Sequence, residues 1–447
     1  MFNRLRYLVI RPITLAIAVA VLTPAADGLA ASTRQVSVES LVYDLNSPDP
    51  VRRQTAVKEL GAVKHRPAIP QLVPLTHDPV VAVRRELELA LENMDDMQTQ
   101  PGFLALSSDA ESDIRSRALA SLVNLHVSRA LGLTATLMNL RERVIFRSDR
   151  DLETIVEPEV PVDPAVVEAL RARLSDSERG IRSIAIRGLG ILRARPAVPD
   201  LLRIVREDRD DGLRFEGVRA LRKIGDASVA GDLVALFNIN DDDVRNELIV
   251  TVGSMRYRGA VAELTRIVDG AVKTDAARVV ALSALADLAD PSSSALFERL
   301  KSDRDDALRL YANEGIARTA APEAKTEISA ARLVDKNARV RMAQAFALLR
   351  LGQPEYLDEL VRGLEHRATR DLAKEYLLET PDADRKALFA PRTVNAAARA
   401  ELADIMGTMG DSDALPVLRD MTNDGDKDVA RAASRAAHRI ALATGEQ

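Results

Sequence analysis

Apolar side chains recur in this chain at the offsets of three and four residues that line one face of an α-helix. In the clearest unit they follow Asp176, at Ile181, Ile184, Ala185, Leu189 and Leu192. Gly190 and Pro196 punctuate the end of this stretch, and a second one has its apolar positions at Val198, Leu201, Leu202 and Val205. The spacing predicts two short helices joined by a turn. Such a hairpin cannot bury its apolar face alone, so it must stack on other hairpins.

The same unit repeats along the chain, and an arginine marks each copy. The marker residues are Arg52, Arg84, Arg115, Arg182, Arg214, Arg245, Arg278, Arg309, Arg341, Arg399 and Arg431. Most neighbouring markers from Arg52 to Arg341 are separated by nearly the same number of residues. The interval from Arg115 to Arg182 is about twice as long. A fixed period of about 20 to 50 residues indicates stacked repeats. We therefore predict an all-α fold, an α-solenoid of about twelve stacked helical hairpins.

The residues around the marker also carry a family resemblance. Asp49-Pro-Val-Arg52 leads to Leu60-Gly61, and Asp241-Asp-Asp-Val-Arg245 leads to Val252-Gly253. This pattern resembles the HEAT-repeat family, in particular the short bacterial HEAT-like repeats of the phycobilisome-lyase type, from about residue 38 to residue 442. The resemblance implies a HEAT-like superhelix. It implies no single activity, because these repeats serve many unrelated roles.

The row of arginines allows two interpretations. As a structural element, each arginine would reach an aspartate in its own or the neighbouring turn, such as Asp176 before Arg182 or Asp241 before Arg245. As a binding element, a row of arginines would grip an acidic partner. The regular repetition favours the structural role, because a partner is not itself repetitive. The partner-binding residues stay unknown at this stage.

Two stretches interrupt the pattern. The doubled spacing between Arg115 and Arg182 contains an irregular insertion near residues 141–165, preceded by a helical pattern at Leu131–Leu140. Three prolines within residues 155–164 exclude a helix there. The insertion is either a degenerate repeat with a long loop or a protruding loop that contacts a partner. A second, degenerate stretch lies near residues 366–395.

The first 30 residues have the pattern of a secretory signal peptide. Arg4, Arg6 and Arg11 precede an apolar run from Ile13 to Leu22, and small residues reach Ala30 and Ala31. This layout predicts cleavage after Ala30 or Ala31 and a solenoid domain over residues 31–447. An uncleaved N-terminal anchor is the alternative. We expect a periplasmic or secreted protein with no membrane span after cleavage.

The amino-acid composition limits the kinds of binding and metal sites that the chain can form. The chain has no cysteine, so it has neither disulfides nor cysteine metal sites. Its formal net charge of −5 argues against a nucleic-acid partner. The five histidines, His65, His77, His126, His366 and His438, show no metal-ligand spacing, and we interpret each as a surface or turn residue. Acidic residues at alternate positions in Asp424-Gly-Asp-Lys-Asp428 resemble a calcium loop, but Arg435 stands where such a loop needs its last glutamate.

We accordingly expect no catalytic residues, no metal and no cofactor. Some HEAT-repeat proteins are di-iron hydroxylases with paired His-Glu steps on successive repeats, whereas this chain has only Glu365-His366, in reverse order. The favoured function is an exported, non-catalytic scaffold that binds a protein or peptide through the solenoid surface. An accessory or maturation subunit of an envelope enzyme complex is the alternative, and an independent enzyme, either a lyase or a hydroxylase, is the least favoured. The oligomeric state stays open.

Overall fold

The computed structural model describes residues 37–130, 155–156, 161–271, 274–319, 324–390 and 393–444. Within these residues the chain forms helices in alternating short and long pairs, which confirms the predicted α-solenoid. The expected signal peptide and the expected helix at Leu131–Leu140 lie outside the described residues.

Twelve hairpins can be traced in the described part of the chain, each a short helix followed by a long one. The short helices are α1 (Val38–Asp44), α3 (Ile69–Leu72), α5 (Gln100–Leu106), α8 (Pro164–Ala172), α10 (Val198–Glu207), α12 (Ala230–Val234), α14 (Val261–Arg266), α16 (Ser294–Leu300), α18 (Lys325–Val334), α20 (Leu357–Gly363), α22 (Asp382–Leu388) and α24 (Leu415–Met421). The long helices are α2 (Pro50–Ala62), α4 (Val81–Met94), α6 (Ser112–Ala130), α9 (Arg179–Ile191), α11 (Asp211–Ile224), α13 (Asp242–Ser254), α15 (Asp275–Leu288), α17 (Asp306–Thr319), α19 (Ala338–Arg350), α21 (Arg370–Leu378), α23 (Ala396–Met409) and α25 (Lys427–Thr444).

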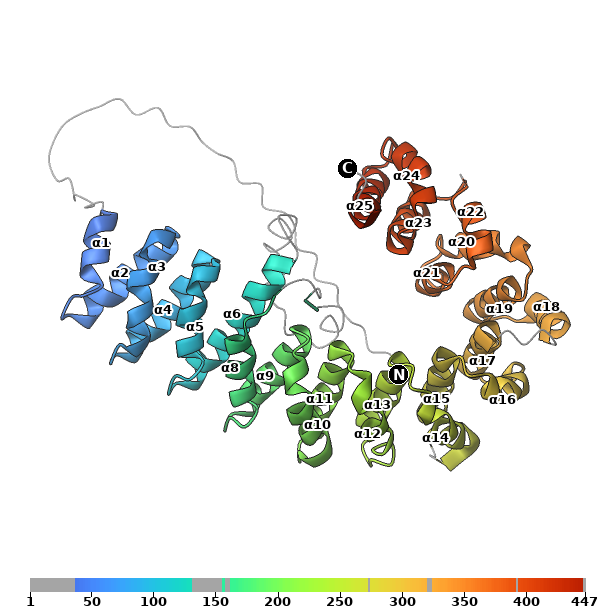
Figure 1. The fold of residues 1–447 in the computed structure, drawn as a ribbon, viewed down its shortest axis with the longest axis horizontal. Coiled ribbons are helices and arrows are strands. Elements are labelled where there is room, and N and C mark those ends of the chain that lie inside the picture. The colour runs from blue at the N-terminus through green and yellow to red at the C-terminus, as the bar shows by residue number, and fades with distance from the viewer. Residues whose placement is uncertain are drawn as a thin grey trace, which may run out of the picture.

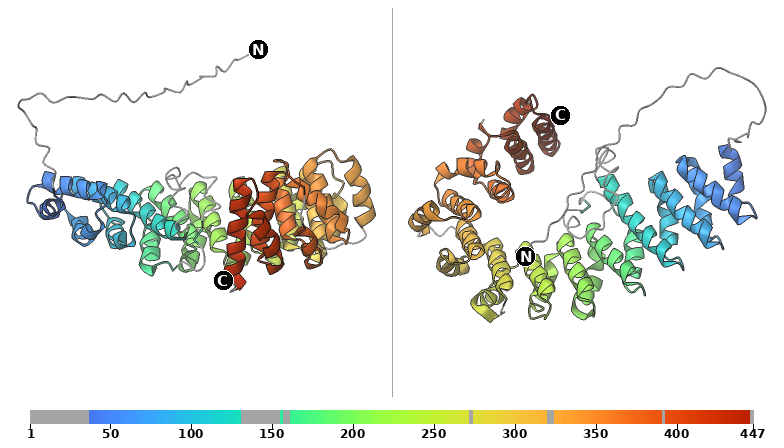
Figure 2. Two further views of the ribbon diagram at one scale, coloured as in Figure 1. Left: turned by 90° about the horizontal axis from the view of Figure 1, so that it is seen from above. Right: turned by 180° about the vertical axis from the view of Figure 1, so that it is seen from behind.

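The hairpins stack into an arc (Figure 1). In its central part the long helices α11, α13, α15, α17 and α19 line the inner side, and the short helices α10, α12, α14, α16 and α18 lie outside them (Figure 1). Figure 2 shows the same stack from above and from behind. None of the helices in the described ranges is long and apolar enough to cross a membrane.

Local sequence sets the helix ends. Asp49, Asp210 and Asn337 precede long helices, and their side chains accept hydrogen bonds from backbone N–H groups of the first turn. Pro50 and Pro164 occupy first helical positions, where no N–H is needed. These caps explain why aspartate precedes so many units of the sequence.

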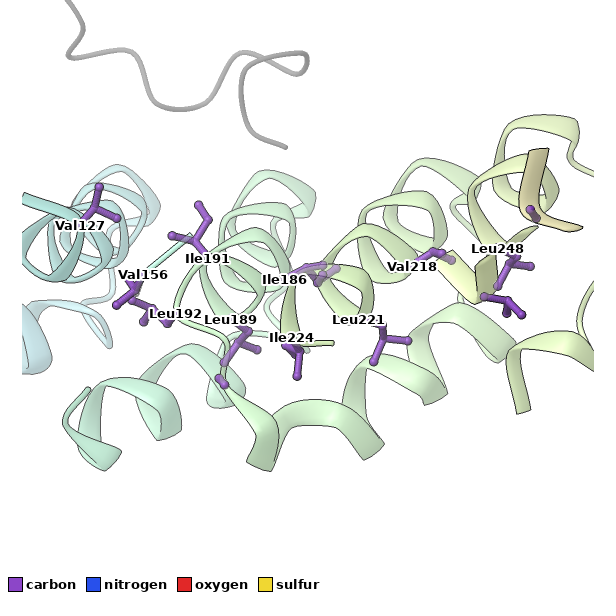
Figure 3. Close-up of a cluster of buried hydrophobic side chains, with 14 of the residues drawn as sticks. Val127, Val156, Ile186, Leu189, Ile191, Leu192, Val218, Leu221, Ile224 and Leu248 are labelled. Atoms are coloured by element: carbon purple, nitrogen blue, oxygen red, sulfur yellow. The ribbon is translucent and has the colours of Figure 1, made fainter. Parts of the chain in front are cut away.

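A single apolar core runs through the stack. Figure 3 shows Ile186 and Leu189 of α9, Val218 and Leu221 of α11 and Leu248 of α13 following one another along it. Each of these side chains is at most 1% exposed. Because every hairpin contributes a few aliphatic residues to this core, no large aromatic anchor is needed.

Glycines let consecutive long helices approach closely. A Cβ atom on Gly190 of α9 would lie 2.7 Å from the Cα atom of Ala220 on α11. Gly61 meets Ala90, Gly253 meets Ala284 and Gly407 meets Ala436 in the same way. The Leu-Gly, Val-Gly and Met-Gly pairs in the sequence therefore mark helix contacts as well as helix ends.

The insertion lies between two consecutive hairpins. Helix α6 packs directly on α9, and a Cβ atom on Gly188 of α9 would meet Val123 of α6 at 2.8 Å. Helix α8 begins directly after its cap Asp163, and most of the predicted insertion, residues 141–154 and 157–160, lies outside the described residues. In the stretch near residues 366–395, by contrast, α20 to α23 form two hairpins, in which the long helix α21 is shortened to 9 residues.

We predict that Gly190→Ala lowers the free energy of unfolding by about 1–3 kcal/mol, because the added methyl group overpacks the contact with Ala220. Gly180→Ala in the same helix is the matched control, since a Cβ atom there meets nothing within 4 Å. It should leave stability unchanged or slightly raised, because alanine favours helix. Urea unfolding followed by circular dichroism measures both. Equal effects of the two substitutions would contradict the packing argument.

Candidate interaction surface

The marker arginines lie at the starts of the long helices, and most of them reach back to the turn before. Arg84 donates from Nη1 to the carbonyl of Asp78, six residues earlier, at 2.8 Å. Arg115, Arg182, Arg309 and Arg341 make the same six-residue contact at 2.8–2.9 Å. This bond ties the end of each short helix to the start of the long helix that follows.

Several of these arginines also grip the next hairpin. Arg84 donates from Nε and Nη2 to both carboxylate oxygens of Asp109, at 2.6 and 2.9 Å. Arg115 binds Asp176 in the same two-pronged way, at 3.0 and 3.1 Å, across the insertion. Because Arg115 also holds the carbonyl of Asp109, each aspartate joins two arginines, one through its side chain and one through its backbone. The result is a chain of bonds from hairpin to hairpin between Arg84 and Arg182, and we call this arrangement the arginine relay.

The first marker needs a correction of one residue. Arg53, not Arg52, binds both carboxylate oxygens of Asp78 and the carbonyl of Ser47. Arg52 instead makes an exposed pair with Asp44 at 2.6 Å. Two adjacent arginines make the register ambiguous in the sequence, and only the distance to Asp78 decides it.

One member of the row was missed. Arg370 starts α21 and donates to the carbonyl of Leu364, again six residues earlier, at 2.9 Å. It lies midway in the sequence between Arg341 and Arg399. The shortened hairpins of this region move it out of the regular period, which is why the stretch looks degenerate.

The relay changes in the middle of the stack. Arg214 and Arg278 reach the carbonyls of Val205 and Val268, and Arg245 reaches that of Ile239. At the spacing that separates Arg84 from Asp109, Arg214 is followed by Ile239 and Arg245 by Gly270, so neither finds a carboxylate there. These two arginines pair with aspartates of their own helices, Asp211 and Asp242.

The relay resumes towards the C-terminus. Arg309 binds both carboxylate oxygens of Asp335 at 2.9 and 3.2 Å. Arg399 binds those of Asp424 at 2.8 and 3.0 Å. Arg431, in the last helix, pairs with Asp428 three residues before it. Asp424 is therefore a relay acceptor, which accounts for the acidic loop that resembles a calcium site.

The relay lowers the pKa values of its carboxylates. Burial alone would raise the pKa of Asp109, but the hydrogen bonds from Arg84 and from the backbone N–H of Glu111 lower this pKa below its usual value. The pKa of Asp176 is lowered in the same way, against burial, by Arg115 and the backbone N–H of Glu178. These carboxylates stay charged and bound within the rim of the stack.

The inner face of the long helices is not repetitive. A Cβ atom on Gly217 would meet Val205 of the short helix α10 at 3.0 Å, so that side of α11 faces outwards. Arg219, two residues on, points about 200° around the helix, to the inner side. From Arg182 to Arg370, the residues five positions after each arginine of the row share this orientation, and Glu314 and Phe346 among them are buried. They are Arg187, Arg219, Val250, Ser283, Glu314, Phe346 and Glu375.

A basic cavity lies on this face between α9 and α11. It has a volume of about 160 Å³, and its lining includes Phe215 and three cations, Arg187, Arg219 and Lys223, against one carboxylate, Glu216. The Arg219 guanidinium lies over the ring of Phe215, 5.5 Å from its centre. The cavity combines positive charge with an aromatic surface, which suits a carboxylate-bearing ligand.

A buried polar network joins three helices further along. The Tyr376 hydroxyl of α21 donates to Glu314 of α17 at 2.5 Å, and Arg318 donates to Glu314 at 3.2 Å and to Glu379 at 2.8 Å. The Tyr376 ring stacks on Phe346 of α19, with 4.4 Å between centres. Burial raises the pKa of Glu314 to about 7, although Arg318 and Tyr376 act against it. Tyr376 and Glu314 lie two hairpins apart, so no local pattern in the sequence linked them.

A second buried carboxylate lies between α4 and α6. Glu88 is 1% exposed, at a position that carries Leu119 and Ile186 in the next two long helices. Burial raises its pKa to about 7, with a contribution from Glu92 and only partial compensation by Arg117. Arg117 approaches to 3.5 Å.

Comparison with family models identifies the repeats in the N-terminal half of the stack. Residues 38–123 and 162–222 match the family description "HEAT repeats". These two stretches are HEAT repeats. The match spans the hairpins on both sides of the insertion, in agreement with the unbroken packing of α6 on α9.

Among solved structures, an engineered protein is 18% identical to this HEAT-repeat chain, covers 90% of it and 98% of its own length, and has a TM-score of 0.36. Importin beta is 11% identical over 90% of this chain and 62% of its own, with a TM-score of 0.40. Human deoxyhypusine hydroxylase in complex with glycerol is 18% identical over 55% of this chain and 96% of its own, with a TM-score of 0.28. No curated protein matches the chain.

The HEAT-repeat hairpins place the histidines mostly at the surface, with one exception. His65 is half-buried, and His77, His366 and His438 are exposed. His126 is buried in α6 with its Nδ1 atom 3.0 Å from the carbonyl oxygen of Leu122, so the surface interpretation is wrong for this residue.

The Glu365-His366 pair takes part in the HEAT-repeat scaffold. The Glu365 carboxylate accepts the backbone N–H of Asn395 at 2.9 Å. Within the described ranges, no group of three histidine, aspartate and glutamate side chains is arranged to hold a metal ion.

We predict that Asp109→Ala lowers the free energy of unfolding by about 3 kcal/mol, because it leaves the Arg84 guanidinium unpaired and removes a backbone cap. Asp113→Ala is the matched control, since its pair with Arg85 is about half exposed. Exposed pairs contribute little. Urea midpoints of both variants measure the difference. If the relay holds hairpins together, Asp109→Ala must lower the free energy of unfolding clearly more than Asp113→Ala does.

Glu88 should make stability depend on pH. Its pKa is about 7 when folded and 4.5 ordinarily, so protonation favours the folded state. This stabilisation is complete below pH 4.5 and is lost as pH rises through 7. Glu88→Gln stays neutral, so its stability relative to the native protein should rise by about 3 kcal/mol between pH 4.5 and 8, at about 1.4 kcal/mol per pKa unit. Urea titrations at several pH values test this, with Glu86→Gln as control. A constant difference would contradict it.

Proposed function

We propose that this HEAT-repeat protein is an exported interaction scaffold, without catalytic activity, that binds a protein or peptide along the inner face of its solenoid. HEAT-repeat solenoids are commonly interaction scaffolds and are typically non-catalytic, which supports the general class. The signal-peptide pattern of residues 1–30 supports export to the periplasm or beyond.

One observation carries the proposal. The starts of the long helices and the turns before them are repetitive, because they hold the arginine relay. The inner face, by contrast, changes from hairpin to hairpin. It is basic at Arg187 and Arg219, apolar at Val250 and acidic at Glu375. A surface that varies in this way can match a non-repetitive partner in one register, which a row of identical side chains cannot do.

The alternative role, a fixed subunit or maturation factor of an envelope enzyme complex, differs in stoichiometry. A tagged full-length protein purified from envelope extract should carry its partners with it. We expect several partners below equimolar amounts for a scaffold, and one equimolar partner for a subunit. The mass of the purified protein also reports cleavage after Ala30 or Ala31.

The same purification tests the inner face. Val250 in α13 is 38% exposed, and Leu333 on the outer helix α18 is 79% exposed. We predict that Val250→Glu reduces partner recovery at least fivefold, whereas the matched Leu333→Glu leaves it unchanged. Circular dichroism checks that both variants fold. Loss of partners in Leu333→Glu alone, or retention of all partners in both, would overturn the inner-face proposal.

A further inference from the structure

The insertion touches the stack at a defined apolar seat. Val156 is 2% exposed, and Figure 3 shows it beside Val127 at the end of α6 and beside Ile191 and Leu192 at the end of α9. Its neighbour Ile155 is 39% exposed. The branched side chain of Val156 is thus buried where two long helices end, while the adjacent Ile155 side chain is partly exposed.

The seat also binds the backbone of the segment through a hydrogen bond. The N–H of Val156 donates to the carbonyl of Ile191 at 2.8 Å. Ile191 is the last residue of α9, and the last carbonyls of a helix have no partner within the helix. Any extended segment can supply such an N–H, so this part of the contact does not depend on the insertion's own sequence.

The basic cavity continues the same surface. Arg187 precedes Ile191 by one helical turn, so the two side chains lie on one face of α9. Arg187 also lines the cavity with Phe215, Arg219 and Lys223. A segment seated at Ile191 that follows the inner face therefore passes from an apolar seat to a basic, aromatic surface within one repeat.

The chain next to Val156 has the complementary composition. Glu153 precedes it by three residues, and Glu157 and Glu159 follow within three. The insertion thus carries the chemistry that this surface is suited to bind.

We infer that the inner face from the end of α6 to α11 is a docking site for an extended peptide that pairs a branched apolar residue with neighbouring carboxylates, and that Val156 of the chain itself occupies its apolar seat. The inference rests on the proposed scaffold function and specifies the chemistry of its partner. A partner segment of this type binds by replacing Val156. The contact is autoinhibitory, since the intramolecular segment is always at hand.

A labelled synthetic peptide of residues 149–163 is the probe, added to the full-length protein and followed by fluorescence anisotropy. We expect Val156→Asp to bind the probe at least tenfold more tightly than the native protein, whose seat is filled. Added salt should weaken this binding, because carboxylates contribute to it. Val156→Gly is a second variant that empties the seat without adding charge. Melting curves check that both variants stay folded.

Matched charge reversals locate the binding. In the Val156→Asp background, Arg219→Glu should abolish probe binding, whereas Arg203→Glu on the outer helix α10, where the arginine is 59% exposed, should not. A probe that itself carries Val156→Asp should not bind. Equal binding by native and Val156 variants, binding by none, or equal loss in Arg219→Glu and Arg203→Glu would overturn the docking site. If Val250→Glu still reduced partner recovery in that case, the proposed scaffold function would remain supported although the docking site was wrong.

Discussion

The structure depends on one arrangement of hydrogen bonds around a guanidinium group. A relay arginine donates to a carbonyl of its own hairpin and to an aspartate of the next, and that aspartate offers its own carbonyl to the following arginine. Arginine suits this role because its donors are spread over a rigid fork and remain charged at all ordinary pH values. Lysine, with one point charge, could not bind a carboxylate with two prongs and a carbonyl at once. The apolar core supplies most of the stability, but the relay sets how one hairpin meets the next.

Periodicity made the fold predictable. The regular spacing of the marker arginines, with apolar positions at helical offsets, was sufficient for the solenoid and for its number of hairpins. The register within a repeat was less certain, as Arg52 and Arg53 show, since adjacent arginines satisfy the same pattern. Arg370 escaped because shortened helices moved it out of phase. Repeats are recognised by their common length, so a marker residue in a hairpin of different length is the first to be overlooked.

The buried acids could not be predicted for a different reason. Glu88 occupies a position that is aliphatic in neighbouring repeats, and a glutamate on an amphipathic helix ordinarily indicates the solvated side. Glu314 and Tyr376 come from helices two hairpins apart, and their contact exists only because the stack curves there. Val156 belongs to a segment with no repeat at all. Each of these depends on three-dimensional neighbours that a single sequence does not encode in any local pattern.

The middle of the relay has a mechanical consequence. Around Arg214 and Arg245 the marker arginines pair within their own helices, and consecutive hairpins there are linked by other ion pairs, such as Arg222 of α11 with Glu247 of α13 at 3.0 Å. A single ionic contact of this kind tolerates sliding better than a two-pronged ion pair, whose energy depends on direction. When the arc is stretched or twisted, strain should concentrate in this central stretch while both ends move as stiff blocks. The solenoid is therefore a spring of uneven stiffness, most compliant beside the helices that form the basic cavity.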